Sequence, residues 1–212
     1  QFVFIKGNEI YDGFSALGIN EAFPTMSPVS LYGASKLASE TLILEYGKCF
    51  DFPVWINRCG VLAGAGQFGK PDQGIFSYWI HSFREKKPLK YTGFGGTGLQ
   101  VRDGLHPKDL APLLVRQMQE PDRDAPKIIN LGGGIKNSMS LKQLSSWCED
   151  RFGSNEVIAS EEDRPMDAPW IVMDSSMARE TQDWIPKTTL NEILKEIANH
   201  AEANPEWLEI TN

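Results

Sequence analysis

Residues 32–56, which read YGASKLASETLILEYGKCFDFPVWI, decide the fold class of this chain. Leu37, Thr41 and Leu44 recur at i, i+4 and i+7, and this spacing predicts a helix over residues 32–50. Pro53 ends that helix, because its ring disfavours the helical conformation of the residue before it. The apolar run at residues 54–56 then predicts a short buried strand. A helix followed closely by a buried strand is the repeating unit of an α/β fold.

The same alternation extends along the rest of the chain. Further strands are predicted at residues 2–5, 89–92 and 128–131. Helices are predicted over residues 74–85, from Pro107 onward, and after two capping boxes that begin at Ser140 and Thr189. Residues 12–31 and 59–73 are interrupted by glycine and proline and are predicted to be loops. The sequence therefore predicts an α/β protein with parallel strands.

The composition excludes several classes of protein. Hydrophobic residues make up 41% of the 212 residues and charged residues 23%, which is typical of a folded globular chain rather than a disordered one. A net charge of −7 argues against a nucleic-acid partner, and no apolar run is long enough for a membrane span. Cys49, Cys59 and Cys148 form no zinc motif and no disulfide pattern, so we expect no metal site and a cytoplasmic location.

Two glycine-rich segments, residues 64–69 and 93–98, match the spacing G-x-G-x-x-G. In dinucleotide-binding folds this motif opens a helix, and the N-terminus of that helix holds the pyrophosphate. Lys70 and Pro71 follow the first segment, and Val101 and Arg102 lie shortly after the second, so neither segment runs directly into a helix. We expect both to be flexible loops, and a true dinucleotide site is the alternative.

Tyr32 and Lys36 lie one turn apart at the start of the first predicted helix, so their side chains share one face. An ammonium group close to a phenol favours the phenolate form. The pair is therefore a candidate general acid and base for a sugar or alcohol hydroxyl. The alternative is an ordinary surface pair, because tyrosine and lysine often occur at this spacing in helices.

Further motifs, in the same chain order, resemble those of the extended short-chain dehydrogenase/reductases, the NAD-dependent nucleotide-sugar epimerase/dehydratase family. The resemblance covers nearly the whole chain. The matching segments are Ile10-Tyr11, Ser27-Pro28, Tyr32-Gly-Ala-Ser-Lys36, Val101-Arg102-Asp103 with His106 and Asp109, Asn130-Leu131-Gly132, and Arg164-Pro-Met-Asp167 with Asp174, Ala178, Trp184 and Pro186. Finer matches at Gln67-Phe68, Asp72-Gln73-Gly74 and Asn137-Ser-Met-Ser-Leu141 resemble the CDP-paratose 2-epimerase subgroup.

The resemblance implies a fold, a cofactor, a substrate and a reaction. The fold would be the C-terminal part of a Rossmann-like doubly wound parallel sheet with a smaller α/β substrate-binding domain. Residues 1–66 and 101–135 would form the first domain, residues 67–100 and 136–204 the second, and residues 205–212 a tail. NAD would be the cofactor and a nucleoside-diphosphate sugar the substrate, epimerised by transient oxidation to a keto sugar and return of the hydride. Family members pair through the helix at residues 32–50, so a homodimer is expected.

The resemblance also assigns roles to the reaction and cofactor residues. Tyr32 would be the catalytic acid and base, and Lys36 would assist it and hold the nicotinamide ribose. Both would contact the cofactor together with Cys59, for which ordinary burial is the alternative. Asp72 and Gln73 would contact the sugar or the nucleotide, and the alternative is a capping role at the start of the following helix.

Arg102 and Arg164 would grip the substrate pyrophosphate. A guanidinium group presents a fork of N–H donors that matches phosphate oxygens. For Arg102, the alternative is an ion pair with a neighbouring aspartate, Asp103 or Asp109. His106, in the same motif, is expected to serve packing and hydrogen bonding.

Two departures from the family pattern leave another function open. The family's first strand, its G-x-x-G-x-x-G turn and its acidic ribose-binding residue have no counterpart. The chain begins at Gln1 inside an apolar run, so we expect it to be a piece of a longer protein. Gly7 stands where the family has a Ser or Thr that contacts the substrate hydroxyl. The alternatives are therefore a truncated or non-catalytic member that binds a nucleotide sugar or a protein partner, or a nucleotide-sugar 4-epimerase or 4,6-dehydratase.

Overall fold

The computed structural model describes residues 5–6, 9–10, 14–25, 30–122, 124–162, 164 and 167–210. The expectations about Gly7, Tyr11, Ser27-Pro28 and Pro165-Met166 lie outside these residues, as does most of the strand predicted at residues 2–5. Among the described residues, no helix has both the length and the apolar character needed to cross a bilayer.

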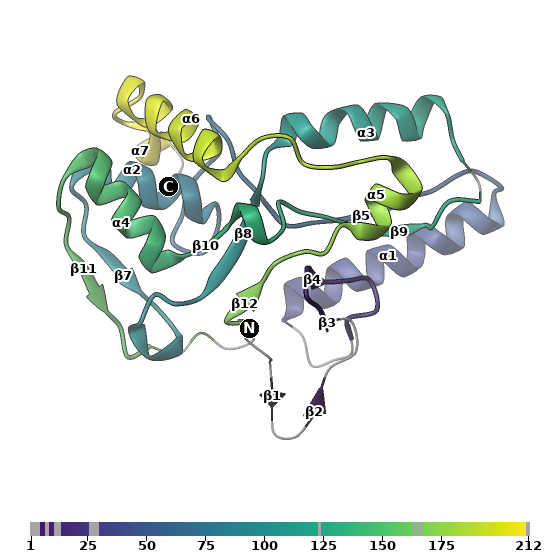
Figure 1. The fold of residues 1–212 in the computed structure, drawn as a ribbon, viewed down its shortest axis with the longest axis horizontal. Helices are drawn as coiled ribbons and strands as arrows, with labels where there is room; N and C mark the ends of the chain where they lie inside the picture. The colour runs from purple at the N-terminus through teal and green to yellow at the C-terminus, as the bar shows by residue number, and fades with distance from the viewer. Residues whose placement is uncertain are drawn as a thin grey trace.

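The described elements alternate between strands and helices along most of the chain (Figure 1). In chain order they are β1 (Ile5–Lys6), β2 (Glu9–Ile10), β3 (Phe14–Ser15), β4 (Gly18–Ile19), α1 (Leu31–Cys49), β5 (Ile56–Cys59), β6 (Val61–Leu62), α2 (Ile75–Glu85), β7 (Leu89–Tyr91), η1 (Phe94–Gly96), β8 (Val101–Leu105), α3 (Pro107–Gln119), β9 (Ile128–Leu131), η2 (Ile135–Asn137), β10 (Ser138–Ser140), α4 (Leu141–Phe152), β11 (Val157–Ala159), β12 (Trp170–Ile171), α5 (Ser176–Gln182), α6 (Leu190–Ala203) and α7 (Trp207–Ile210).

Most strand pairs that connect distant parts of the chain are parallel. β5 pairs with β9 in parallel, with Ile56 opposite Ile128, and β7 pairs with β11 in parallel. β8 lies at the centre of the molecule and pairs in parallel with β6 and β12 and antiparallel with β10. The predicted α/β class with parallel strands is confirmed.

Two hydrophobic clusters form on either side of β8. One joins α2, α4 and α6 around Trp79, Ile80, Leu144 and Ile197. The other lies under α3 and α5 and contains Leu105, Leu113, Ile129, Leu131 and Trp184. In Figure 1, α2, α4, α6 and α7 accordingly gather at one end, and α1, α3, α5, β5 and β9 lie at the other.

The helices agree well with the sequence prediction, because their signals are local. α1, α2 and α3 begin within one residue of their predicted starts. Both capping boxes form. The Ser140 hydroxyl accepts from the Gln143 amide and the Thr189 hydroxyl from the Glu192 amide, and each N3 side chain bonds back to the amide of its cap residue.

The strand predictions need two corrections. The strand expected at residues 54–56 is instead Ile56–Cys59, because pairing with β9 begins only at Ile56. The predicted loops contain short strands, β3 and β4 within residues 12–31 and β6 within residues 59–73. Of the strand expected at residues 2–5, only Ile5 is described, and it lies in β1, paired antiparallel with Ile10.

Candidate functional site

A cavity of about 240 Å³ lies where the start of α2, strand β8 and the segment around Arg164 meet. Its lining includes all four residues that the sequence predicted to bind substrate, Asp72, Gln73, Arg102 and Arg164. These residues are spread over nearly a hundred positions of sequence, so the fold alone brings them together.

Arg102 points from β8 into this cavity and is engaged by an aspartate on the far wall. Its Nη2 donates to Oδ1 of Asp167 at 2.5 Å, and its Nη1 donates to the Val101 carbonyl at 2.7 Å. Burial lowers the pKa of Arg102, and the Asp167 carboxylate acts against this by raising it. The alternative pairing of Arg102 with Asp103 or Asp109 is therefore wrong.

Asp167 lies between two guanidinium groups. Its other oxygen, Oδ2, is 3.7 Å from Nε of Arg164. A carboxylate and a phosphate occupy the same kind of position against an arginine fork. Asp167 thus contacts both of the arginines that line the cavity.

Asp72 and Gln73 belong to a tight turn that precedes α2. The backbones of Lys70 and Gln73 bond to each other in both directions, at 2.8 and 3.2 Å. Gly74 caps α2 in the left-handed conformation, with φ of 64°, and makes no side-chain capping bond. Asp72 and Gln73 are thus not the helix cap, and the capping alternative is wrong.

Part of the cavity lining is apolar. Ile75 and Phe76 from α2 and Leu141 and Leu144 from α4 contribute to it. A lining that combines apolar side chains with two arginines suits a ligand with one flat or apolar part and one anionic part.

Tyr32 and Lys36 lie on the first two turns of α1, apart from this cavity's lining. Ser30 caps the helix, and its hydroxyl accepts from the Gly33 amide at 3.0 Å. The Lys36 ammonium lies 5.3 Å from the centre of the Tyr32 ring, so the two side chains do share a face, and Tyr32 is 69% exposed. A phenol with an adjacent ammonium is thereby presented to whatever binds over this end of α1.

Cys59 is the last residue of β5 and is half-buried. Burial raises the pKa of its thiol, so the group stays neutral and is a poor nucleophile. The carboxyl end of a parallel strand is where α/β sheets bind ligands, and Cys59 lies at such an end.

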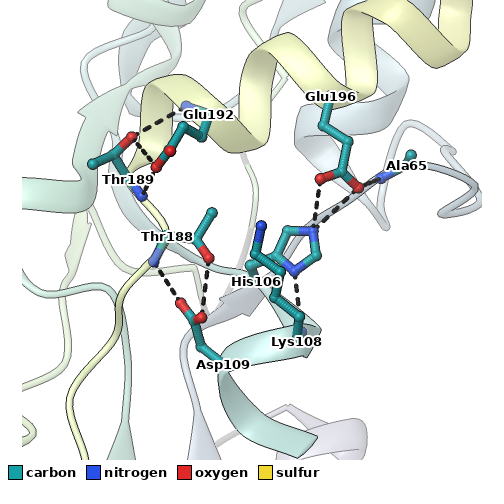
Figure 2. Close-up of polar contacts among 8 residues, drawn as sticks. All are labelled: Ala65, His106, Lys108, Asp109, Thr188, Thr189, Glu192 and Glu196. Carbon is teal, nitrogen blue, oxygen red and sulfur yellow. Dashed lines mark hydrogen bonds and ion pairs between the residues drawn. The ribbon is translucent and has the colours of Figure 1, made fainter.

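Figure 2 shows a junction of polar contacts that connect the start of α3 to α6 and to the segment before α6. Nδ1 of His106 accepts from the Lys108 amide at 3.0 Å, so Nε2 carries the proton that points to Glu196, 3.1 Å away. Glu196 also accepts from the Ala65 amide. Burial alone would raise the pKa of Glu196, but these hydrogen bonds outweigh burial and lower it. Glu196 of α6 thus ties together the glycine-rich loop at residue 65 and His106 at the start of α3.

Asp109 makes the second connection in this junction. Its carboxylate accepts from the Thr188 amide at 2.7 Å (Figure 2). The carboxylate also accepts from the Lys187 amide at 2.9 Å, and the backbone carbonyl accepts from Trp184. His106 and Asp109, the motif residues that follow Arg102, therefore connect the start of α3 to α6 and to the segment before α6.

Neither glycine-rich segment opens a helix directly. A turn separates Gly69 from α2, and Leu99 and Gln100 lead from Gly98 into β8. In the second segment a side chain at Gly96 would collide with Ala159 and Ser160, so this glycine permits close packing against β11. Close packing against β11 thus explains the presence of one glycine, Gly96, in the second G-x-G-x-x-G segment.

Sequence reasoning missed two partners in the site. Asp167 was quoted only as part of a motif, and its contact with Arg102 spans 65 residues of sequence. Arg58, on β5, binds Glu40 of α1 through two hydrogen bonds of 2.8 and 2.6 Å. No spacing rule indicates either contact. Within the described residues, no three metal-ligating side chains lie close enough to hold an ion.

Comparison with known proteins assigns this arrangement to a family. The model of the NAD dependent epimerase/dehydratase family matches residues 1–132, and the chain belongs to that family. Among curated relatives, CDP-paratose 2-epimerase of Salmonella typhi is 30% identical over 76% of this chain and 48% of its own length. UDP-glucose 4-epimerase of Azospirillum brasilense is 26% identical over 88% of this chain and 56% of its own length. The chain thus spans about half the length of these relatives.

Solved structures agree with the fold. UDP-glucuronic acid 4-epimerase from Bacillus cereus, in complex with UDP-glucuronic acid and NAD, matches with a TM-score of 0.76 and 26% identity over 92% of this chain and 59% of that one. The dTDP-glucose 4,6-dehydratase DesIV from Streptomyces venezuelae matches with a TM-score of 0.78 over 94% of this chain and 59% of that one, at 20% identity. The predicted family is confirmed.

Proposed function

We propose that the whole protein is an NAD-dependent epimerase of a nucleoside-diphosphate sugar, similar in reaction to CDP-paratose 2-epimerase. The observation that carries this proposal is the cavity in which Arg102 and Arg164 contact one carboxylate and whose lining also contains apolar side chains. A nucleoside diphosphate has the matching parts, a flat base and two adjacent anionic groups. Some relatives are 4-epimerases and 4,6-dehydratases, and those reactions are the alternative for the same site.

In this proposal the two arginines bind the pyrophosphate. Asp167 holds them in the free protein, since its carboxylate takes the position of an anion between them. Asp72 and Gln73 contact the sugar or nucleotide from the turn before α2. Affinity therefore comes mainly from residues that take no part in proton transfer.

Tyr32 and Lys36 carry out the proton transfer. The Tyr32 oxygen removes the proton from a sugar hydroxyl while the carbon is oxidised, and returns it when the keto sugar is reduced on its other face. The Lys36 ammonium stabilises the phenolate that forms in the first step. NAD supplies the hydride acceptor and donor.

The described residues suit the nicotinamide end of that cofactor. Tyr32 and Lys36 offer exposed hydrogen-bond donors at the start of α1, and Cys59 ends the neighbouring strand β5. We assign Tyr32, Lys36 and Cys59 to cofactor contact on that basis. Neither G-x-G-x-x-G segment runs straight into an α-helix, so we assign neither of them to the cofactor pyrophosphate.

We extend the proposal to domains, assembly and location. Residues 1–66 and 101–135 belong to the cofactor domain, residues 67–100 and 136–204 to the substrate domain, and residues 205–212 form the tail. The exposed apolar side chains of α1, including Leu42, Ile43 and Tyr46, support a homodimer through this helix. Cys49, Cys59 and Cys148 are all free thiols, which fits the cytoplasm.

Substitution of Tyr32 by Phe tests the reaction. We expect Tyr32→Phe to lower kcat of the whole protein about 10²–10⁴-fold, because it removes the acid and base, while nucleotide-sugar affinity stays near wild type. The substrate is the one turned over fastest in a panel of CDP-, UDP- and dTDP-sugars. Tyr46→Phe, on the same helix, is the matched control. Near-normal kcat in Tyr32→Phe would remove this tyrosine from the mechanism.

A further inference from the structure

α1 rests on the rest of the molecule along a single narrow line. One of its residues is buried and four are half-buried, and all other positions of the helix are exposed. The five are spaced by alternating steps of four and three, which places them on one stripe. They are Gly33, Leu37, Glu40, Leu44 and Gly47.

The stripe carries little apolar area to fix the rotation of the helix. Two of its members are glycines and two are leucines that are only half-buried. Apolar packing is non-directional, so such a contact resists a small rotation or slide weakly. The remaining member, Glu40, is charged and occupies the middle of the stripe.

Glu40 is gripped at both of its oxygens by Arg58 of β5. Nε of Arg58 donates to Oε1 at 2.8 Å and Nη2 donates to Oε2 at 2.6 Å. The two side chains are only 18% and 20% exposed. Two parallel charge-assisted bonds fix direction as well as distance. In the part of the chain that the structure describes, this is the one ion pair between α1 and the sheet.

Lys36 lies one turn before this Glu40–Arg58 ion pair on α1. Tyr32, Lys36 and Glu40 follow one another at intervals of four, so Lys36 has Tyr32 one turn before it and Glu40 one turn after it. Arg58 binds both oxygens of Glu40, and the Lys36 ammonium makes no ion pair with Glu40 and lies over the Tyr32 ring.

We propose that Glu40 and Arg58 are positioning residues for the catalytic pair: they fix the register of α1 on the sheet and keep Glu40 from drawing Lys36 away from Tyr32. This inference rests on the proposed function of Tyr32 and Lys36. Neither Glu40 nor Arg58 touches the substrate in this account. Their effect on the reaction is transmitted through the placement of the two side chains on the first turns of α1.

The test compares variants of the whole protein by steady-state kinetics on the sugar chosen from the same panel. Glu40→Gln removes the charge and one strong acceptor, and Arg58→Met frees Glu40 to pair with Lys36. We expect each to lower kcat at least tenfold, since a shift of about 1 Å in a catalytic group has effects of this size. KM should stay within about twofold of wild type, because the substrate-binding arginines lie on other elements.

Two controls separate positioning from general destabilisation. Glu45→Gln makes the same substitution at an exposed site of α1 and should leave kcat unchanged. Leu44→Ala weakens the same stripe without touching the ion pair. Amide hydrogen exchange across α1 and the melting temperature are measured for every variant. We expect faster exchange near Tyr32 in Glu40→Gln, and a larger loss of kcat than in Leu44→Ala at a matched melting temperature.

The outcomes distinguish this inference from the proposed function. Wild-type kcat in Glu40→Gln together with an inactive Tyr32→Phe would overturn the positioning role and leave the function standing. Equal losses of kcat in Glu40→Gln and Leu44→Ala would also overturn it. An active Tyr32→Phe would overturn the proposed function itself. If Glu40→Gln does not fold, Glu40→Asp, which keeps the charge but shortens the side chain, is judged by the same criteria.

Discussion

His81 makes the folded protein sensitive to acid in a way that one substitution should reveal. It lies on α2 in the core, with 0% of its surface exposed, and neither ring nitrogen has a hydrogen-bond partner among the described residues. Burial, together with the nearby His200, Arg84 and Lys87, lowers the pKa of His81 from 6.5 to about 4. As pH falls from 6.5 to 4, the unfolded chain takes up a proton that the folded chain refuses, so stability is lost over this window.

The magnitude follows from the separation of the two pKa values. A difference of one unit corresponds to about 1.4 kcal/mol, so His81 should contribute a loss of about 3 kcal/mol by pH 4. Asp103 acts in the opposite direction. Burial raises its pKa from 3.8 to about 6, so its contribution to stability increases by a similar amount as pH falls. The pH dependence of wild-type stability therefore hides the contribution of His81. Only the difference in stability between wild type and a His81 variant reveals that contribution.

The assay is urea unfolding of wild type and His81→Phe, followed by tryptophan fluorescence at pH 7, 6, 5 and 4.5. Phe keeps an aromatic ring against His200, whose ring centre lies 5.6 Å from that of His81. The free energy of unfolding of the variant should fall less toward low pH, so the gap between the two proteins changes by about 2–3 kcal/mol in its favour. Asp103 is common to both proteins and cancels. A gap that is the same at every pH would refute the assignment.

Two further predictions concern binding and assembly. Arg102→Ala and Arg164→Ala should each weaken binding of a nucleoside-diphosphate sugar by about 1.5–3 kcal/mol, with a smaller loss at high salt, and wild-type affinity by calorimetry would make both arginines structural. Ile43→Glu places a charge on the exposed apolar face of α1 and should convert a dimer to a monomer in light scattering of the whole protein, whereas an unchanged mass would move the interface elsewhere.

The sequence predicted elements whose signals are local and missed those set by pairing across the chain. Capping boxes at Ser140 and Thr189 act within four residues, so the starts of α4 and α6 could be predicted closely. The β5 prediction was shifted because the apolar residues Val54 and Trp55 precede the paired segment. Two of the paired residues, Asn57 and Arg58, are polar. Their side chains are used by Gln117 and Glu40, partners that a hydrophobic pattern does not indicate.

Predictions for the candidate site show the same difference between local signals and contacts across the chain. Asp72, Gln73, Arg102 and Arg164 could be selected because each lies in a motif, and the structure gathers them around one cavity. The partners of these four residues are set by the fold, and the motifs do not indicate them. The partner expected for Arg102 was an aspartate one or seven residues away, and the actual partner is Asp167, on a segment that follows β11. The motif therefore selected Arg102 as a site residue, but it did not predict which aspartate Arg102 contacts.

In the segment from Arg102 to Asp109, residues of a single motif lie in different surroundings and make different kinds of contact. Side chains alternate across a strand, so Arg102 on β8 faces the cavity while Asp103, with 0% exposure, faces inward. Asp103 accepts from the amides of Gly134 and Met173 there, which holds the turn after β9 and the segment after β12 against β8. His106 and Asp109 then fix the start of α3 to α6 and to residue 188. One residue of this segment lines the cavity, and three hold the surrounding elements against one another. The placement of Arg102 at the cavity thus depends on the contacts that Asp103, His106 and Asp109 make elsewhere.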